Sequence, residues 1–369
     1  MNSFEKTEKM FNCNGVPSKK SDVPIQPIMI CTQGALCPDT TQKDIIDDYK
    51  KWMHASDYFF ENYGKPDVFQ SAYAGDVMYA LALETRRPGY ELEDNELYQF
   101  VETCKMDLDD YKTIIEKGWS GWFNKYMGSI QHPPCGNFKV IMGFIKMGIH
   151  TGKIHKWLNS KGIVPLQDSG STPGFDMLSQ IRSFEDFICD IYDEPDLVKQ
   201  ASARVTEDSI KTTLKNCKKM VGRIAIYPMR SSAGAISPDI FKEFSWPDMK
   251  KMILAFHDAG YRTIVHADGD WIPMLESFKE LPKTCCHFEF DNQTDIFKAA
   301  GILDGWHSFK GNVPATMMAF GKPEEVSEYC DKLITEIGLK TPGFMLGSGC
   351  EVPLNVKPEN MKAFMNSVK

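Results

Sequence analysis

The amino-acid sequence predicts an α/β fold, a (β/α)₈ TIM barrel with a helical N-terminal extension or insertion. Three observations favour this class. The chain has 369 residues, of which 42% are apolar, enough for the core of one large barrel. Apolar strand-like runs alternate with amphipathic segments through the C-terminal half, which is typical of parallel β structure. No glycine-rich dinucleotide loop follows the first strand, which argues against the alternative, a doubly wound open sheet.

The first half of the chain has few clean strand patterns. We interpret residues 1–22 as a polar lead-in and residues 23–369 as a single barrel domain. The insertion, around residues 75–160, is rich in Met, Trp, Lys and Tyr and is expected to be helical. Within it, His132-Pro-Pro-Cys-Gly136 is expected to shape a loop, with pocket lining as the alternative. The other elements predicted here are a strand at 23–31, a helix at 44–63 and a strand at 163–167.

The second half alternates more regularly. The segment 239–259 has apolar residues at three- and four-residue steps, which predicts an amphipathic helix, and Gly260 is a typical residue after a helix end. Pro323 is expected near the start of the last long helix. The remaining predictions are a helix at 194–219, a strand at 223–227, strand–helix units at 261–280, 284–303 and 305–338, a strand at 343–346 and a helix from Pro358.

Composition excludes several classes of function. The formal net charge is −8 and no basic cluster is interleaved with aromatic residues, so we expect no nucleic-acid partner. The longest apolar stretch, 140–149, is interrupted by Lys146 and is too short to span a bilayer, so we expect no membrane association. Eleven cysteines without regular spacing do not suggest a disulfide framework and fit a cytoplasmic protein. Nucleophile-elbow and P-loop motifs are absent from the sequence.

Candidate metal ligands stand where predicted strands end. His266 and Asp268 are two residues apart after a β-branched run, so their side chains point to the same face. Glu289 and Cys350 stand at the ends of two later strand-like segments. Three of them have an ordinary alternative: His266 as a hydrogen-bonded core residue, Asp268 as a helix cap, and Cys350 as a small buried apolar residue. A buried Glu289 would be costly unless it is paired or bound to metal. In a barrel, however, consecutive strand ends converge on one mouth, which would bring all four together.

A mixed set of nitrogen, oxygen and sulfur donors suits Zn²⁺. We therefore predict metal binding by His266, Asp268, Glu289 and Cys350. Three protein ligands and one open position would make the site catalytic. The predicted catalytic residues are His266, Asp268 and Lys310, the last at another strand end.

Two adjacent cysteines, Cys285 and Cys286, do not have the spacing of a metal motif, and we expect them to pack in the core.

Several stretches of the chain together form a recognisable pattern: Ser232–Phe241 with Trp246-Pro247, His266–Gly269, Lys310–Pro314, Gly321–Val326, and Gly347–Pro353 with Pro358–Asn360. In these stretches the chain resembles the uroporphyrinogen decarboxylase superfamily, specifically its cobalamin-dependent methyltransferase branch. The resemblance covers residues 180–369 well and the N-terminal half only loosely.

The departures from the family pattern are informative. The decarboxylases carry Arg-Gln-Ala-Gly-Arg-Tyr after the first strand, whereas this chain has Ile30-Cys-Thr-Gln-Gly-Ala35, without the arginines that would bind a tetrapyrrole's carboxylates. The methyltransferases have a His-x-Cys zinc motif and a distant Gly-Cys step. His266 and Cys350 match its first and last ligands, and Asp268 stands in place of the first cysteine. Asp268 replaces that thiolate, or Glu289 completes the site instead.

The resemblance implies a zinc-dependent methyltransferase. It would move a methyl group from a methoxylated, aromatic substrate to the Co(I) corrinoid of a partner protein, as in an O-demethylase. Cobalamin would arrive on that partner, because no histidine here has the Asp-x-His-x-x-Gly context of a corrinoid-binding signature. The alternatives are methyl transfer from a methylcorrinoid to a thiol or tetrahydrofolate, and a non-catalytic tetrapyrrole-binding protein. Cofactor-binding residues stay unassigned, and we expect a monomer or homodimer.

Overall fold

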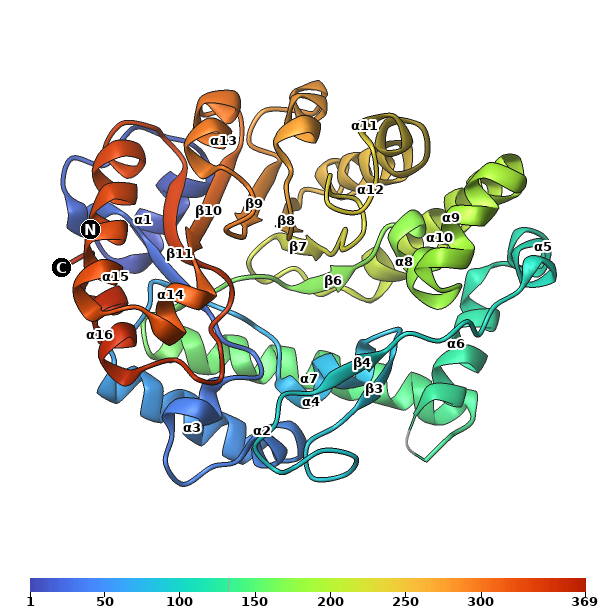
Figure 1. The fold of residues 1–369 in the computed structure, drawn as a ribbon, viewed down its shortest axis with the longest axis horizontal. Coiled ribbons are helices and arrows are strands. Elements are labelled where there is room, and N and C mark those ends of the chain that lie inside the picture. Colours follow the sequence, from blue (N-terminus) through green and yellow to red (C-terminus); the bar gives the residue numbers. More distant parts are fainter. Residues whose placement is uncertain (132) are drawn as a thin grey trace.

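A curled parallel β-sheet forms the centre of the protein. The computed structural model describes residues 1–131 and 133–369, so His132 and its predicted loop role lie outside the described residues. Seven strands pair in parallel in the order β1-β11-β10-β9-β8-β7-β6 and curl into a half-barrel (Figure 1). The strands are β1 Ile25–Ile28, β6 Ser169–Ser171, β7 Arg223–Ile226, β8 Arg262–Ala267, β9 Cys286–Phe290, β10 Ser308–Val313 and β11 Phe344–Glu351.

The two edges of the half-barrel are bridged by a separate small sheet. Strands β2 (Val68–Phe69) and β5 (Val164–Pro165) pair in parallel. Asp67 N, next to β2, donates to Ile25 O of the edge strand β1 at 3.0 Å. On the other side, β5 leads after three residues into β6, the opposite edge strand. The predicted α/β class with a parallel sheet is confirmed. Closure into a full eight-stranded barrel stays a prediction, because these linking strands are too short to continue the ladder.

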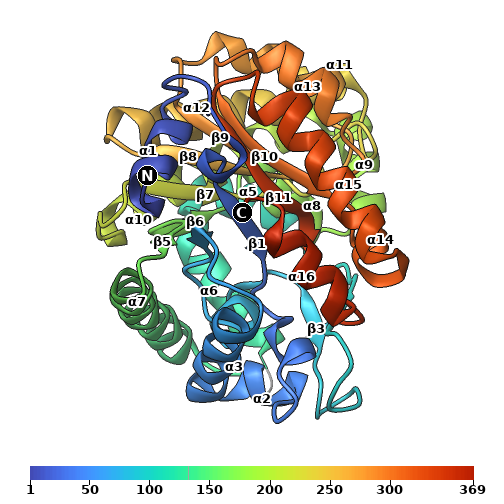
Figure 2. The same cartoon turned by 90° about the vertical axis from the view of Figure 1, so that its left-hand side faces the viewer.

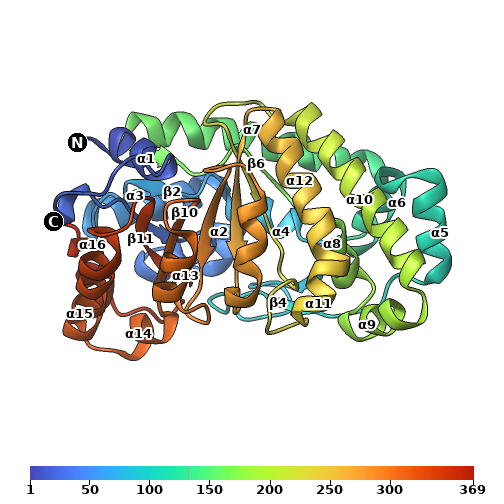
Figure 3. The ribbon, with the colours of Figure 1, turned by 90° about the horizontal axis from the view of Figure 1, so that it is seen from above.

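Helices cover the outer face of the sheet (Figure 3). Helix α12 (Trp246–Asp258) shows why: Met249, Met252, Ile253 and Phe256 are fully buried and face the strands. Each buried side chain of this size contributes about 1.5–3 kcal/mol. The other helices of this half are α8 Gly174–Ile181, α9 Phe184–Asp193, α10 Pro195–Asn216, α11 Pro238–Ile240, α13 Ile296–Leu303, α14 Ala315–Phe320, α15 Pro323–Leu333 and α16 Pro358–Asn366, with the 3₁₀ helix η4 at Ile272–Glu280.

The polar lead-in folds into a helix that closes one end of the half-barrel. Helix α1 (Ser3–Phe11) begins with a capping box between Asn2 and Glu5. Met10 and Phe11 at its end are buried in a small cluster with residues of β7, β8 and β11. Phe11 packs edge-on against His287 with ring centroids 4.9 Å apart. Helix α1 therefore covers the amino ends of the central strands.

The region 75–160 contains helices and one hairpin. It lies with α2 and α3 across the half-barrel from α11 to α13 (Figure 2), and both chain ends lie at the same end of the molecule. Its longest element is α7, which leads directly into β5. The elements of this half are α2 Gln42–Asp47, α3 Tyr49–Asn62, α4 Ala74–Ala80, the antiparallel pair β3 Glu84–Arg86 and β4 Gln99–Val101, α5 Leu108–Lys117, α6 Trp119–Ile130 and α7 Asn137–Ser160. Among the described residues, no helix is long and apolar enough to cross a membrane.

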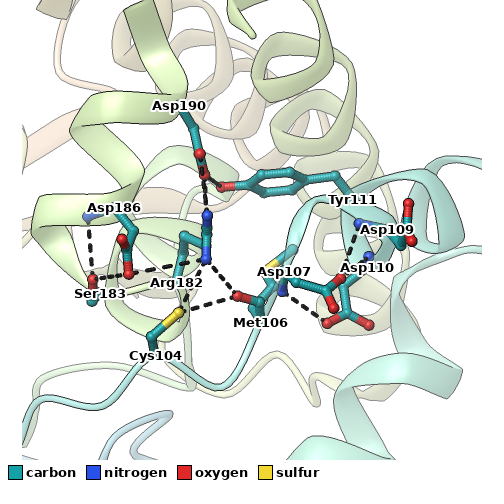
Figure 4. Close-up of polar contacts among 10 residues, drawn as sticks. All are labelled: Cys104, Met106, Asp107, Asp109, Asp110, Tyr111, Arg182, Ser183, Asp186 and Asp190. Carbon is teal, nitrogen blue, oxygen red and sulfur yellow. Dashed lines mark hydrogen bonds and ion pairs between the residues drawn. The ribbon is translucent and has the colours of Figure 1, made fainter. Parts of the chain in front are cut away.

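A polar clamp fastens this region to the helices of the half-barrel (Figure 4). Arg182 Nε lies 2.8 Å from Asp190 Oδ2, and Arg182 Nη1 donates to Met106 O at 2.9 Å. Tyr111 in α5 donates to the same carboxylate at 3.0 Å. Burial, Asp190 and the hydrogen bond to it raise the pKa of the Tyr111 phenol, so this donor keeps its proton. One mostly buried carboxylate thus joins α5, α8 and α9.

We predict that Arg182→Ala lowers the free energy of unfolding by about 3 kcal/mol, because Asp190 is left buried without its cation. Tyr111→Phe should cost about 1 kcal/mol, the net value of one hydrogen bond. Denaturant unfolding measures both. Lys112→Ala is the control, because its ion pair with Asp109 is exposed and should contribute little. Equal effects of Arg182→Ala and Lys112→Ala would contradict the clamp.

Candidate metal centre

The carboxyl ends of three strands bring the predicted ligands together. His266 is in β8, Glu289 is in β9, and the two residues are direct neighbours in the parallel register. Cys350 is near the end of β11, and Asp268 follows β8 by one residue. Because parallel strands run in the same direction, their carboxyl ends meet at one edge, as expected for a site in an α/β protein.

Three side chains form the compact part of this cluster. Cys350 Sγ lies 3.8 Å from His266 Nε2 and 3.8 Å from Asp268 Oδ2. His266 Nε2 lies 3.3 Å from Asp268 Oδ2. Their candidate ligand atoms are all within 4.8 Å of one another. A single ion placed among them could contact one nitrogen, one oxygen and one sulfur atom.

Glu289 lies on the opposite side of the histidine ring. Its Oε2 is 3.0 Å from His266 Nδ1, so it faces the nitrogen that points away from Asp268 and Cys350. Metal-binding histidines commonly donate their second N–H to a carboxylate, which fixes the tautomer and the ring orientation. This geometry suits Glu289 to orienting His266 and leaves it outside the three-residue donor group.

A buried cation and an amide hold Glu289 in place. Lys310 is fully buried, and its Nζ lies 3.4 Å from Glu289 Oε1. Gln26 Nε2 donates to the same oxygen at 3.0 Å. Burial alone would raise the pKa of Glu289, but Lys310 and His266 outweigh it and hold that pKa well below its usual range. Lys310, predicted to be catalytic, is thus placed as the counter-ion of Glu289.

The cluster favours a bound cation electrostatically. Burial opposes the charged form of His266, yet Asp268, Cys350 and Glu289 outweigh it and raise the pKa of the imidazole well above its usual value. Asp268 Oδ1 is buried and has no hydrogen-bond partner among the described residues, which leaves a lone pair free for a ligand. Nitrogen, oxygen and sulfur donors around a negative site fit Zn²⁺, whereas Ca²⁺ and Mg²⁺ would not select the thiolate.

The loop that carries Asp268 is tightly determined. Gly269 has φ +89°, and a Cβ there would lie 2.3 Å from Ser232 Oγ, so both the conformation and the space require glycine. Gly269 N donates to Asp291 Oδ2 at 2.8 Å, and Trp271 Nε1 donates to Asp268 O at 2.9 Å. Asp268 is therefore held by its neighbours and does not cap a following helix.

Cys350 is positioned by the residue after it. Glu351 Oε1 accepts from Ile30 N at 2.7 Å and also from Cys31 N. These bonds attach the end of β11 to the loop after β1, where the decarboxylase motif would stand.

Sequence reasoning missed Gln26, Glu351 and Tyr227. Gln26 had a usable signal, because a polar residue within the apolar strand Ile-Gln-Pro-Ile must find a partner inside the sheet. Tyr227 lies beside His266 with ring centroids 6.1 Å apart. The sequence offered no comparable signal for Tyr227 or Glu351, since their roles depend on contacts between distant strands.

A buried aspartate supports the loop against which Gly269 packs. Asp176 accepts from Arg230 N at 2.9 Å and from Ser231 Oγ. Burial raises the pKa of the Asp176 carboxyl to about 7, because the charged form loses its hydration there. The loop that includes Ser232 therefore rests on a carboxyl group that is only partly ionised at neutral pH.

Comparisons with known proteins place the chain in a family. Residues 170–369, more than half of the sequence, match the model of the uroporphyrinogen decarboxylase (URO-D) family, and the chain belongs to this family. No curated protein sequence gives a significant match. Among solved structures, a methyltransferase from Methanosarcina mazei is similar with a TM-score of 0.68 and 15% identity, over 100% of this chain and 98% of that one. At this identity the likeness supports the fold alone.

We predict that Glu289→Gln weakens zinc binding about 10- to 100-fold, because His266 loses the carboxylate that orients it. Competition with a chromophoric chelator measures the dissociation constant. Glu276→Gln on the exposed face of η4 is the control and should leave zinc affinity unchanged. An unchanged zinc affinity in Glu289→Gln would refute the orienting role.

The raised pKa of Asp176 predicts a pH-dependent stability. An unfolded aspartate has a pKa of about 3.9, so below about pH 4 Asp176 is protonated in both the folded and the unfolded state. Its full contribution to the free energy of unfolding is present there. That contribution is lost as pH rises through about 7. Asp176→Asn should reduce the fall in unfolding free energy between pH 4 and 8 by about 2–4 kcal/mol. Urea unfolding across this range tests it, and an identical pH profile in the variant would contradict it.

Proposed function

We propose that this protein is a zinc-dependent methyltransferase that moves a methyl group from a methoxylated, aromatic substrate to the Co(I) corrinoid of a partner protein. The observation that carries the proposal is the His266, Asp268 and Cys350 cluster at the carboxyl ends of the strands. Membership of the URO-D family and the fold shared with the Methanosarcina mazei methyltransferase support it.

The residues have distinct roles in this proposal. His266, Asp268 and Cys350 would hold Zn²⁺, and Glu289 would keep the imidazole turned toward it. Bound zinc supplies a Lewis acid that stabilises the oxygen leaving group of a methyl ether. Three protein ligands leave a position for that oxygen.

The aspartate is the reason for choosing an ether substrate. A second thiolate would make the donor set softer and better suited to a thiol acceptor. Asp268 supplies a hard oxygen instead, which favours an oxygen-containing substrate. Lys310 neutralises Glu289, so the orienting carboxylate adds little net negative charge behind the histidine.

The corrinoid would come from a separate protein that docks over the carboxyl ends of the strands. The amino ends are closed by α1, so the metal cluster can be approached only from the opposite side. A cytoplasmic location, and a monomer or homodimer, remain part of the proposal.

Methyl transfer can be assayed in both directions. We expect demethylation of a veratrole-type ether with reduced Co(I) cobalamin, followed by the absorbance of methylcobalamin as it forms. His266→Ala should lower this rate by at least about 100-fold, because removing a metal ligand removes the leaving-group stabilisation. His257→Ala, which removes a half-buried histidine of α12 outside the cluster, is the matched control and should leave the rate unchanged.

Two results would overturn the proposal. One is transfer only from methylcobalamin to a thiol or tetrahydrofolate, which would assign the reverse half-reaction. The other is purified protein without stoichiometric zinc and with the same activity in His266→Ala.

A further inference from the structure

We propose that Cys285, Cys286 and His307 form a second metal site, one for a soft, low-coordinate ion of the Cu(I) type. The site lies at the amino ends of β9 and β10, opposite to the cluster around His266. It shares no residue with that cluster, so it does not depend on the proposed methyltransferase activity. The sequence alone favoured a packing role for the two cysteines, because adjacent cysteines do not make a metal motif.

The fold supplies the third donor that the sequence spacing lacks. His287 pairs with Ser308 in the parallel register, so the preceding residues, Cys286 and His307, also lie side by side. Thr284 N donates to Trp306 O at 2.7 Å and holds the two strand entrances together. Candidate ligand atoms of the two cysteines and His307 all lie within 4.8 Å of one another.

The spacing of the sulfur atoms suits a shared ion. Cys285 Sγ and Cys286 Sγ are 3.6 Å apart. Two thiolates at a typical zinc–sulfur distance of about 2.3 Å from one ion would be separated by about 3.7–4.0 Å in tetrahedral or trigonal geometry. Only a small movement of either side chain is needed to bind one ion.

The histidine presents an unused lone pair. His307 is fully buried, and its Nε2 lies 3.0 Å from the carbonyl oxygen of Phe278. A carbonyl only accepts, so Nε2 carries the proton and Nδ1 is the unprotonated nitrogen. Nδ1 has no hydrogen-bond partner within the described part of the chain, although a buried unpaired acceptor costs about 1–3 kcal/mol. A bound ion would satisfy this nitrogen.

The donor number and charge favour a monovalent soft ion. In the described residues the group contains only these three donors, all buried, whereas structural zinc is almost always four-coordinate. Two thiolates and an imidazole suit Cu(I). With Cu(I), two thiolates leave one negative charge, which the nearby Arg262 guanidinium can balance. Arg262 is held at the entrance to β9, where its Nε donates to Thr284 O at 2.7 Å.

Anaerobic titration of the reduced full-length protein with Cu(I) tests this site. A bicinchoninate competitor suppresses weak binding to the other thiols. We expect one tightly bound equivalent in the wild type, a higher thermal unfolding midpoint, and an X-ray absorption spectrum with two sulfur neighbours and one nitrogen neighbour. The double variant Cys285→Ala with Cys286→Ala should lose this equivalent, and His307→Gln should lose the nitrogen neighbour.

Two control variants separate this site from the other thiols. Cys189→Ala removes an exposed thiol on α9, and Cys350→Ala removes the thiol of the His266 cluster; both should keep the Cu(I) equivalent. Circular dichroism of the metal-free variants checks that they fold. The proposal fails if the wild type binds no Cu(I) against the competitor, or if the loss occurs in Cys350→Ala. It also fails if the two cysteines form a disulfide in the purified protein, or if a four-coordinate zinc ion occupies them.

Discussion

The buried carboxylate of Glu289 is the contact on which the candidate site depends. An isolated carboxylate in this position would be very costly, so it must be paired. Lys310 and Gln26 contact one carboxylate oxygen, Oε1, and His266 contacts the other, Oε2. The same contacts join β1, β8, β9 and β10 across the interior of the sheet. The same carboxylate therefore both neutralises the charge of Lys310 inside the sheet and orients the ring of His266.

The two ends of the half-barrel differ in kind. At the amino ends, Phe11 of α1 closes the interior and packs against His287, and the buried Cys285, Cys286 and His307 lie where β9 and β10 begin. At the carboxyl ends, the strands terminate in loops held by Gly269, Asp291 and Glu351. Helix α1 thus covers the amino ends, whereas the candidate metal centre of His266, Asp268 and Cys350 lies at the carboxyl ends.

Much of the fold could be predicted because its signals are local. The predicted helix at 239–259 corresponds to α11, the π-helical turn Phe241–Ser245 and α12 in succession, and its end agrees with Gly260. Apolar residues at three- and four-residue steps gave this signal, since they must face a core. The helix α1 was not predicted, because its polar sequence shows only two buried apolar residues, and their packing partners are distant in sequence. The small sheet of β2 and β5 was also hard to foresee, since two-residue strands have no periodicity.

The sequence by itself determined the order of the strand–helix units and the position of His266, Asp268 and Cys350 near strand ends, because periodicity and residue type are properties of short segments. Only the tertiary structure decided which atom faces which partner. In the structure, Glu289 contacts the imidazole of His266 on the side away from Cys350, and Lys310 is the counter-ion of that carboxylate. His307 lies beside Cys285 and Cys286, whose adjacent positions in the sequence had argued against a metal site. These are distances between side chains on separate strands, and they follow from strand register, which no short segment encodes.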